Sequence, residues 1–262
     1  MRYCRFQANA GPRYGRIEDG RIVELLTFTP EHAARGERSS AVALEAVRLL
    51  PPVEPSKIIC VGRNYRDHAS ELGNELPPEP LLFFKPPSSL LAHGAAIVLP
   101  PAGVTGRVDF EGELGAIVGR RCRNLGPGDD VRAFLRGYTC VNDVTARDLQ
   151  KKDGQWTRAK GFDTFCPVGP VVVTADELDL HAAGSTGAEI TTTLNGERRQ
   201  HGHTRDLIFA LDHVVRYISQ VMTLEPGDLI STGTPAGVGP MKTGDVVEVS
   251  ITGIGTLRNT VA

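Results

Sequence analysis

Residues Arg107–Gly119 have the sequence RVDFEGELGAIVG, and the predicted fold is built outward from this stretch. β-Forming and small apolar residues dominate it, and glycines mark both ends, which is the pattern of a strand between turns. Glu111 and Glu113 lie two residues apart, and successive side chains of a strand alternate between its faces. The sequence therefore predicts a strand that carries both carboxylates on the same face.

Two carboxylates this close repel each other and resist joint burial unless a cation lies between them. A site with only oxygen ligands favours a hard ion, so we expect Mg²⁺ or Mn²⁺, with Ca²⁺ as a substitute. The alternative is a solvated edge strand with Glu111 and Glu113 on the surface. Taken alone, the E-x-E pair favours that alternative, and the rest of the chain reverses the preference.

The composition of the 262-residue chain, 40% hydrophobic and 23% charged, is that of a globular protein with a sizeable core. The net charge of −2, with no basic run, argues against nucleic acid or an anionic membrane as the partner. No stretch approaches a transmembrane length. Five scattered cysteines form no C-x-x-C motif, so neither a disulfide framework nor a zinc site is expected. These features predict a cytoplasmic protein.

Two domains are predicted, joined by the proline-rich linker 51–56, PPVEPS. Residues 1–50 form a small N-terminal α+β domain, and residues 57–262 form the main domain. In the small domain we expect short strands and one helix, Ala41–Leu50, with Ser39 or Ser40 as its N-cap. The expected strands of the small domain are Arg2–Phe6, Tyr14–Ile17 and Arg21–Leu25.

The main domain is predicted to be rich in strands. Amphipathic spacing from Thr204 to Met222 predicts one helix that packs on the sheet and carries no chemistry. The glycine-rich loop 233–239 can present backbone N–H groups to an anion, but it lacks the nucleotide P-loop motif. Besides Arg107–Gly119, the expected strands are Lys57–Gly62, Leu81–Lys85, Ala95–Leu99, Tyr138–Asp143, Pro170–Thr174, Glu189–Asn195, Glu197–His201, Asp228–Thr232, Asp245–Ile251 and Gly255–Val261.

His68 and Glu71 lie at positions i and i+3 of a helix predicted at Asn64–Leu72, so they share one helix face. A carboxylate beside a histidine orients the ring and favours its protonated form, which prepares the histidine to act as a general base. The alternative is an ordinary exposed His–Glu pair, and these two residues alone favour it.

Asp143 stands at the end of a predicted strand, and Arg147 and Gln150 follow it at i+4 and i+7 of a helix predicted at Val144–Lys151. All three share one side of that turn. The alternative is a helix-capping aspartate with exposed polar partners. Lys160 lies in a predicted loop of glycine, proline and polar residues, where it could equally be a solvated lysine.

Six motifs occur in order along residues 61–239: VGRNYRDHASE, FFKP, VDFEGELGAIVG, VNDVTARDLQ, KGFDTFCPVGP and STGTPAGVG. Together they resemble the fumarylacetoacetate hydrolase family. The closest resemblance is to its bacterial 2-hydroxyhepta-2,4-diene-1,7-dioate isomerases, acylpyruvate hydrolases and oxaloacetate decarboxylases. The resemblance covers about residues 57–262 and, more weakly, the N-terminal unit. It implies a β-rich α+β fold with a mixed, rolled sheet, and a homodimer.

By motif position, the resemblance implies that Glu111, Glu113 and Asp143 are metal ligands. His68 and Glu71 match the catalytic H-x-x-E dyad on a lid helix, and Lys160 matches the lysine beside the developing enolate. The family's substrate contacts correspond to Gln150 and Thr234, with Arg147 in the same motif. Asp109 precedes the glutamate pair but is not counted as a ligand.

The resemblance implies a metal-dependent enzyme that acts on a small 2-oxo acid. The expected reaction is C–C bond hydrolysis of an acylpyruvate, or the related isomerisation of 2-hydroxyhepta-2,4-diene-1,7-dioate in aromatic catabolism. Decarboxylation of oxaloacetate is the alternative reaction. A non-catalytic 2-oxo-acid- or metal-binding protein on the same scaffold is the alternative class, although simple binding would not need His68, Glu71 and Lys160.

Overall fold

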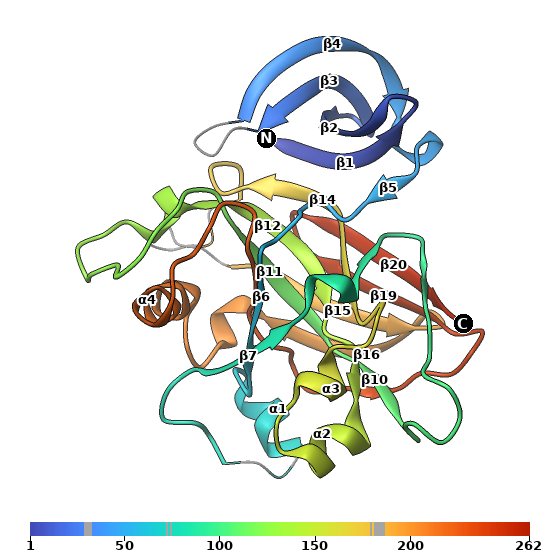
Figure 1. The fold of residues 1–262 in the computed structure, drawn as a ribbon, viewed down its shortest axis with the longest axis vertical. Helices are drawn as coiled ribbons and strands as arrows, with labels where there is room; N and C mark the ends of the chain where they lie inside the picture. The colour runs from blue at the N-terminus through green and yellow to red at the C-terminus, as the bar shows by residue number, and fades with distance from the viewer. Residues whose placement is uncertain (29–32, 72, 74, 179, 181–186) are drawn as a thin grey trace.

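The computed structural model describes residues 1–28, 33–71, 73, 75–178, 180 and 187–262 (Figure 1). In this described part, twenty strands stand beside four α-helices and four short 3₁₀ helices. The expected β-rich α+β class is confirmed, and the sheets are mixed and open. The helices are α1 Arg66–Glu71, α2 Arg147–Asp153, α3 Thr157–Lys160, α4 Leu211–Val221, η1 Leu44–Ala46, η2 Pro87–Ser89, η3 Val131–Phe134 and η4 Thr204–Asp206.

The largest sheet has twelve strands, and its main path runs β4-β3-β2-β1-β14-β12-β11-β17-β6-β7. Off this path, β5 pairs with β1 and β8 pairs with β14. The pairs β17–β6 and β14–β8 are parallel, and the others are antiparallel. The strands are β1 Arg2–Ala8, β2 Gly11–Glu18, β3 Arg21–Phe28, β4 Ala33–Ala43, β5 Leu49–Leu50, β6 Ile58–Gly62, β7 Leu81–Lys85, β8 Leu90–Ala92, β11 Gly112–Val118, β12 Leu135–Asn142, β14 Cys166–Thr174 and β17 Leu229–Ser231.

Two smaller sheets complete the fold. A five-stranded sheet runs β16-β15-β19-β20-β9, and a three-stranded sheet runs β13-β10-β18. The hairpin between β15 and β16 turns at Asn195 and Gly196, as predicted, and both residues have positive φ, which a tight hairpin turn requires. The strands are β9 Ala96–Ile97, β10 Val108–Phe110, β13 Thr145–Ala146, β15 Glu189–Leu194, β16 Glu197–His203, β18 Gly239–Pro240, β19 Val246–Ile251 and β20 Gly255–Val261.

The N-terminal strands extend the central sheet, because β1 pairs with β14 and aligns Arg2 with Val173. In Figure 1, β1–β4 curl into a small roll at one end of the molecule, and β5 leads from it into the main body. The predicted helix at Ala41–Leu50 is wrong. Its first residues extend β4, which pairs with β3, and η1 and β5 take most of the rest. An available strand partner has overridden the local helix propensity.

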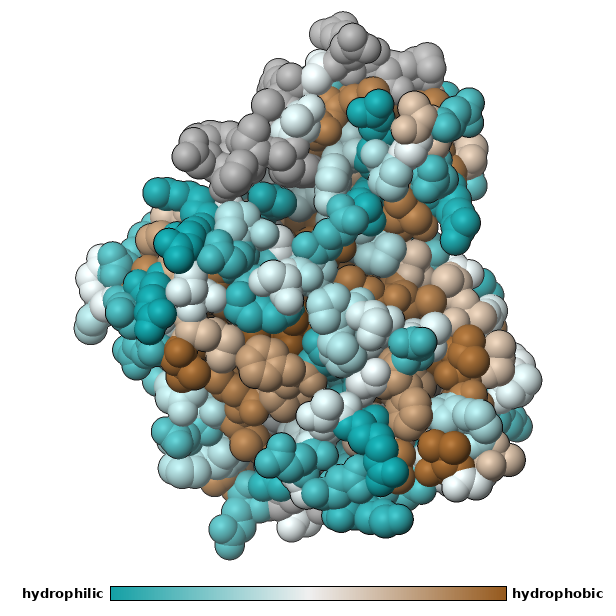
Figure 2. Space-filling view, in the orientation of Figure 1, coloured by the Kyte–Doolittle hydropathy of each residue, from teal (hydrophilic) through white to brown (hydrophobic). Residues whose placement is uncertain are grey.

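The main core lies between the central sheet and the five-stranded sheet. Leu114 of β11 packs in the same apolar cluster as Ile190 of β15 and Val249 of β19, and the apolar face of α4 covers one side of it. Side chains alternate along β11, so Glu113 points away from this core. Figure 2 shows hydrophilic residues over the end of the molecule that carries α1 and α2, and apolar residues across its middle.

Three predicted elements differ from the structure in their bounds. The strand Arg107–Gly119 is divided at Glu111, where β10 leaves for the three-stranded sheet and β11 enters the central sheet. The helix expected from Val144 begins at Arg147, because β13 pairs with β10 first. The helix expected from Thr204 begins at Leu211, since Leu207 bridges to Tyr65 and the backbone N–H of Ile208 donates to the carbonyl of Asn64.

Across the described residues, no helix combines the length and the apolar character that crossing a membrane requires.

Candidate active site

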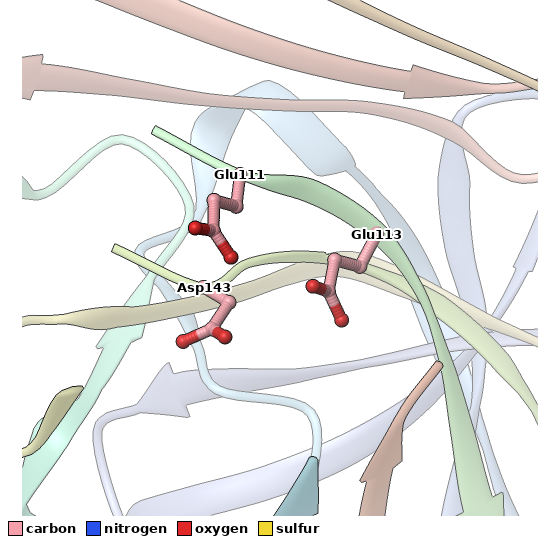
Figure 3. A group of neighbouring side chains, drawn as sticks. All are labelled: Glu111, Glu113 and Asp143. Atoms are coloured by element: carbon pink, nitrogen blue, oxygen red, sulfur yellow. The ribbon is translucent and has the colours of Figure 1, made fainter. Parts of the chain in front are cut away.

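The three predicted metal ligands converge on one point (Figure 3). Glu111 lies at the junction of β10 and β11, Glu113 lies on β11, and Asp143 follows the last residue of β12. β11 and β12 pair here, and the backbone N–H of Asp143 donates to the carbonyl of Glu111 at 2.8 Å. One carboxylate oxygen from each residue lies within 4.8 Å of the other two, and all three side chains are buried. This geometry suits a hard divalent cation.

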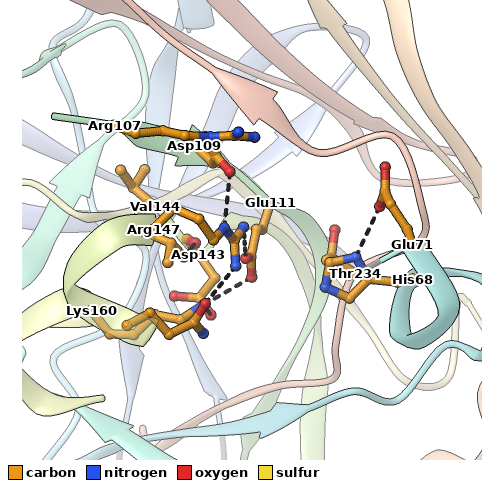
Figure 4. A network of polar contacts seen from close by, with 12 residues as sticks. His68, Glu71, Arg107, Asp109, Glu111, Asp143, Val144, Arg147, Lys160 and Thr234 are labelled. Atoms are coloured by element: carbon orange, nitrogen blue, oxygen red, sulfur yellow. Dashed lines mark hydrogen bonds and ion pairs between the residues drawn. The ribbon is translucent and has the colours of Figure 1, made fainter. Parts of the chain in front are cut away.

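Basic side chains surround two of these carboxylates (Figure 4). Lys160 Nζ donates to Glu111 Oε2 at 2.9 Å and to Asp143 Oδ2 at 2.5 Å. Lys85 Nζ donates to Asp143 Oδ1 at 2.6 Å, and Arg147 Nη2 donates to Glu111 Oε1 at 2.5 Å. Lys160 is the last residue of α3 and is buried, so the solvated-loop alternative is wrong. The interactions with Lys160 and Arg147 lower the pKa of Glu111, although its burial alone would raise it.

Asp109 supports this arrangement from outside the three-carboxylate cluster. It is fully buried, and its two oxygens accept hydrogen bonds from Arg147 Nε at 2.9 Å and Arg107 Nε at 2.8 Å. Arg147 therefore bridges Asp109 and Glu111, and its third nitrogen, Nη1, donates to Gln150 Oε1 at 2.7 Å. The pKa of Arg147 is held above its usual value because these acidic partners outweigh the effect of its burial. The guanidinium stays charged and fixed in place.

Glu113 differs from the other two predicted ligands, because no lysine or arginine in the described part of the chain forms an ion pair with it. Its Oε2 accepts hydrogen bonds from Ser231 Oγ at 2.5 Å and from the backbone N–H of Gly233 at 2.8 Å. Burial, reinforced by the negative charges of Asp143 and Glu111, raises the pKa of Glu113 to about 8. A carboxylate that lacks a cation partner beside two other carboxylates is what a metal-binding residue should be.

The predicted dyad forms at the same site. His68 is buried on α1, and its Nδ1 lies 3.3 Å from Glu71 Oε2. The backbone N–H of Gly237 donates to both oxygens of Glu71, at 3.1 and 3.2 Å, which ties α1 to the glycine-rich loop. Figure 4 shows His68 beside Thr234, facing the carboxylates from the side opposite Lys160. His68 is therefore buried inside the site, whereas Glu71 is exposed at its edge.

A cavity of about 270 Å³ joins the dyad to the carboxylates. This volume is near the lower end of the range for ligand pockets, roughly 300–1,000 Å³, and suits a small molecule. Lys160 Nζ lies 5.0 Å from the centre of the Phe83 ring, and Phe83 packs edge-on against Trp156 at 5.1 Å. All nine predicted site residues come together here, and eight of them line the cavity: His68, Glu111, Glu113, Asp143, Arg147, Gln150, Lys160 and Thr234. Glu71 does not line the cavity but contacts His68 Nδ1.

Lys85 and Gln200 both contribute to the site, although neither was predicted from the sequence. Gln200 is fully buried on β16; its Oε1 accepts from the N–H of Gly112 at 2.9 Å, and its Nε2 donates to Thr234 Oγ1 at 2.8 Å. Lys85 is the last residue of β7 and lies in the motif FFKP, which is the sequence feature that could have identified it as a site residue. Gln200 follows a charged hairpin, and no local pattern distinguishes it from a surface glutamine.

Two family models cover nearly the whole chain. The model described as Fumarylacetoacetate (FAA) hydrolase C-terminal matches residues 57–262, and the model described as Rv2993c-like, N-terminal, matches residues 1–52. The chain belongs to the fumarylacetoacetate hydrolase family. The resemblance found in the six sequence motifs is thereby confirmed.

Relatives in this family carry several enzyme names. The chain is 49% identical to Protein Rv2993c of Mycobacterium tuberculosis, over 100% of this chain and 98% of that protein. It is 38% identical to the 2,4-didehydro-3-deoxy-L-rhamnonate hydrolase of a Sphingomonas species, over 100% of this chain and 96% of that protein. It is also 41% identical to oxaloacetate tautomerase YisK of Bacillus subtilis, over 83% of this chain and 74% of that protein.

Solved structures give the same fold over the full chain. The 2-hydroxyhepta-2,4-diene-1,7-dioate isomerase of Mycobacterium marinum has a TM-score of 0.87 at 41% identity, covering 100% of this chain and 98% of that chain. The 5-carboxymethyl-2-hydroxymuconate delta-isomerase of Mycobacterium smegmatis has a TM-score of 0.88 at 40% identity, covering 100% and 99%. Two structures named as isomerases therefore share this fold, and relatives named as a hydrolase and a tautomerase are similar to this chain in sequence.

Proposed function

We propose that this protein is a divalent-metal-dependent enzyme of 2-oxo acids that hydrolyses a C–C bond of an acylpyruvate or isomerises 2-hydroxyhepta-2,4-diene-1,7-dioate. The observation that carries the proposal is one cavity in which the buried carboxylates Glu111, Glu113 and Asp143 face the His68–Glu71 pair. A binding protein would need the carboxylates but no base beside them. The five unpaired cysteines fit a reducing, cytoplasmic setting.

Glu111, Glu113 and Asp143 would hold the cation, and Mg²⁺ or Mn²⁺ suits these oxygen donors. The bound ion would supply Lewis acidity toward the carboxylate and 2-oxo oxygens of the substrate. Glu113, whose raised pKa favours a proton in the metal-free protein, would give up that proton when the ion binds. Lys160 and Arg147 then hold Glu111 in position from the opposite side.

In the hydrolytic reaction, His68 would take a proton from a water molecule that attacks the distal C4 carbonyl of the acylpyruvate. Breaking the C3–C4 bond leaves its electron pair on C3 of the pyruvate unit, and a proton delivered to C3 completes pyruvate and the free acid. Glu71 orients the imidazole through Nδ1. Lys160 contributes positive charge near the developing enolate, and Gln150 and Thr234 contact the substrate.

Oxaloacetate chemistry is the second candidate, supported by the 41% identity to oxaloacetate tautomerase YisK. Decarboxylation would use the same carboxylates and Lys160 without an attacking water, so it would depend less on His68. A direct test is a panel assay in the presence of Mg²⁺. It follows pyruvate release from acetylpyruvate and fumarylpyruvate, isomerisation of the heptadienedioate, and CO₂ release from oxaloacetate. Turnover of an acylpyruvate or of the heptadienedioate supports the proposal, turnover of oxaloacetate alone supports the second candidate, and turnover of none of them contradicts both.

A further inference from the structure

Two cations line the cavity without a carboxylate partner in the described part of the chain: Arg63, which follows β6, and Lys151 in α2. Arg63 is half-buried and Lys151 is exposed. The cations deeper in the site each pair with an acidic residue of the site, as described above. Four basic groups, Lys85, Arg107, Arg147 and Lys160, equal in number the four carboxylates of the buried network, Asp109, Glu111, Glu113 and Asp143, although Glu113 forms no ion pair with any of them. Arg63 and Lys151 are surplus positive charge that a ligand could neutralise.

The backbone of Arg63 is held on both sides. A side chain at Gly62 would place its Cβ 2.6 Å from the Trp156 ring, so only glycine fits there. Asn64 is fully buried; its Oδ1 accepts from the N–H of Phe209 at 2.7 Å, and its Nδ2 donates to the carbonyl of Thr232 at 2.8 Å. Between them, Arg63 has a φ of +56°, a left-handed conformation that is uncommon for arginine. Such a conformation persists only where the surroundings fix it, and it is enriched at ligand sites.

The rest of the cavity wall suits the carbon chain of a ligand that carries a charged group at each end. Val61, Phe83 and Trp156 give it an apolar side, against which a short carbon chain can pack. A ligand with one charged end at the carboxylate cluster and the other at Arg63 would use both polar regions and the apolar wall.

We propose that Arg63 is a specificity-determining residue that binds a second carboxylate at the far end of the substrate. The site would then prefer 2-oxo dicarboxylates to 2-oxo acids that end in an alkyl group. A guanidinium binds a carboxylate through two parallel hydrogen bonds, which gives geometric selectivity as well as affinity. Lys151 adds charge but is solvated, so its contribution is small. This inference rests on the proposed function in placing the 2-oxo acid head at Glu111, Glu113 and Asp143.

The test is calorimetric binding to the Mg²⁺-loaded protein of matched ligand pairs that differ at the far end of the chain. The pairs are 2-oxoglutarate with 2-oxopentanoate, and 2-oxoadipate with 2-oxohexanoate. At one chain length or both, the dicarboxylate should bind about 10-fold more tightly or better. Arg63→Gln should remove this preference by weakening the dicarboxylate alone. No preference in the wild-type protein at either length, or no binding of any of the four, overturns the proposal.

Two further variants separate the subsite from misfolding. Arg63→Asn removes the guanidinium but favours the left-handed backbone, so it should lose the preference as Arg63→Gln does. Arg66→Gln changes an exposed arginine on α1 that does not line the cavity, and it should leave both affinities unchanged. Equal weakening of both ligands by the Arg63 variants would overturn the proposal. This binding test does not depend on turnover. If no substrate of the panel assay is turned over but the Arg63-dependent preference is present, the proposed reaction is refuted and the role of Arg63 stands.

Discussion

The side-chain carbonyl of Gln200 accepts a hydrogen bond of 2.9 Å from the backbone N–H of Gly112. Gly112 stands between Glu111 and Glu113 and is packed so closely that a Cβ there would lie 2.1 Å from Thr192 Oγ1. Gln200 also donates to Thr234 Oγ1 and to the carbonyl of Pro235, at 2.8 and 2.7 Å. One buried amide therefore fixes the spacing of the glutamate pair and the position of the glycine-rich loop.

We expect Gln200→Leu to lower Mn²⁺ affinity by about 10-fold or more, as loss of an outer-shell hydrogen bond typically does. The buried N–H of Gly112 would lose its partner, so the free energy of unfolding should also fall by about 1–3 kcal/mol. Calorimetric Mn²⁺ titration and urea unfolding measure the two effects. Gln220→Leu, at an exposed position of α4, is the control. Unchanged Mn²⁺ affinity in Gln200→Leu would show that Gln200 is not a positioning residue.

His68→Ala should leave the binding of the metal and of oxalate, a mimic of the 2-oxo acid or its enolate, nearly intact. It should lower kcat by about 10²–10⁴-fold, the usual effect of losing a general acid–base group. Glu71→Ala should cause a smaller loss, because the imidazole remains but is less well oriented. The double variant should be little worse than His68→Ala, since residues that act as a unit are non-additive. Steady-state kinetics and calorimetry measure these effects.

The same variant separates the two candidate reactions. Decarboxylation needs no attacking water, so His68→Ala should impair oxaloacetate turnover less than acylpyruvate hydrolysis. His201 and Glu189 form an exposed pair 3.9 Å apart, and His201→Ala should change neither rate. Equal losses in both reactions would mean that His68 has a role other than water activation, such as proton delivery. No loss in either would show that the dyad is not catalytic.

Glu113 should make the stability of the metal-free protein depend on pH. Burial and the charges of Asp143 and Glu111 raise its pKa from an ordinary 4.5 to about 8. Below about pH 4.5 the carboxyl group is protonated in both the folded and the unfolded protein, and its full contribution to the free energy of unfolding is present. Between about pH 4.5 and 8 the unfolded chain loses the proton that the folded protein keeps, so the free energy of unfolding falls as pH rises. Above about pH 8 the contribution is lost.

Glu113→Gln keeps this position neutral at every pH, so it should flatten the decline across that window. Urea unfolding of chelator-treated protein at several pH values measures the slope, with Glu197→Gln, an exposed substitution on β16, as the control. A variant slope equal to that of the wild-type protein would contradict the prediction.

Glu113→Ala should lose metal affinity while the metal-free fold survives, because a site that holds repelling carboxylates contributes little to stability. Calorimetric Mn²⁺ titration should show weakened or absent binding, and circular dichroism should show an unchanged spectrum. Glu197→Ala, on the exposed face of β16, should bind Mn²⁺ as the wild-type protein does. Wild-type affinity in Glu113→Ala would remove Glu113 from the ligand set.

Local patterns predicted the parts of the site that lie close together in sequence. Strand alternation and the flanking glycines placed Glu111 beside Glu113, and helical spacing placed His68 beside Glu71. Lys85 and Gln200 were not predicted, because they reach Asp143 and Gly112 from 58 and 88 residues away through the packing of elements that are distant in sequence. The N-terminal helix was wrong because Val42 and Ala43 pair with Ile22 and Arg21 of the preceding strand β3, a pairing that local helix signals do not reveal.

The metal dependence of pyruvate release tests whether Glu111, Glu113 and Asp143 form the metal site. The protein is treated with EDTA, freed of chelator and assayed with acetylpyruvate and fumarylpyruvate before and after Mg²⁺ or Mn²⁺ is added back. Activity should be abolished by chelation and restored by either ion, because Glu111, Glu113 and Asp143 would hold the ion that polarises the substrate. Full activity after exhaustive chelation would contradict the assignment of the three carboxylates as the metal site.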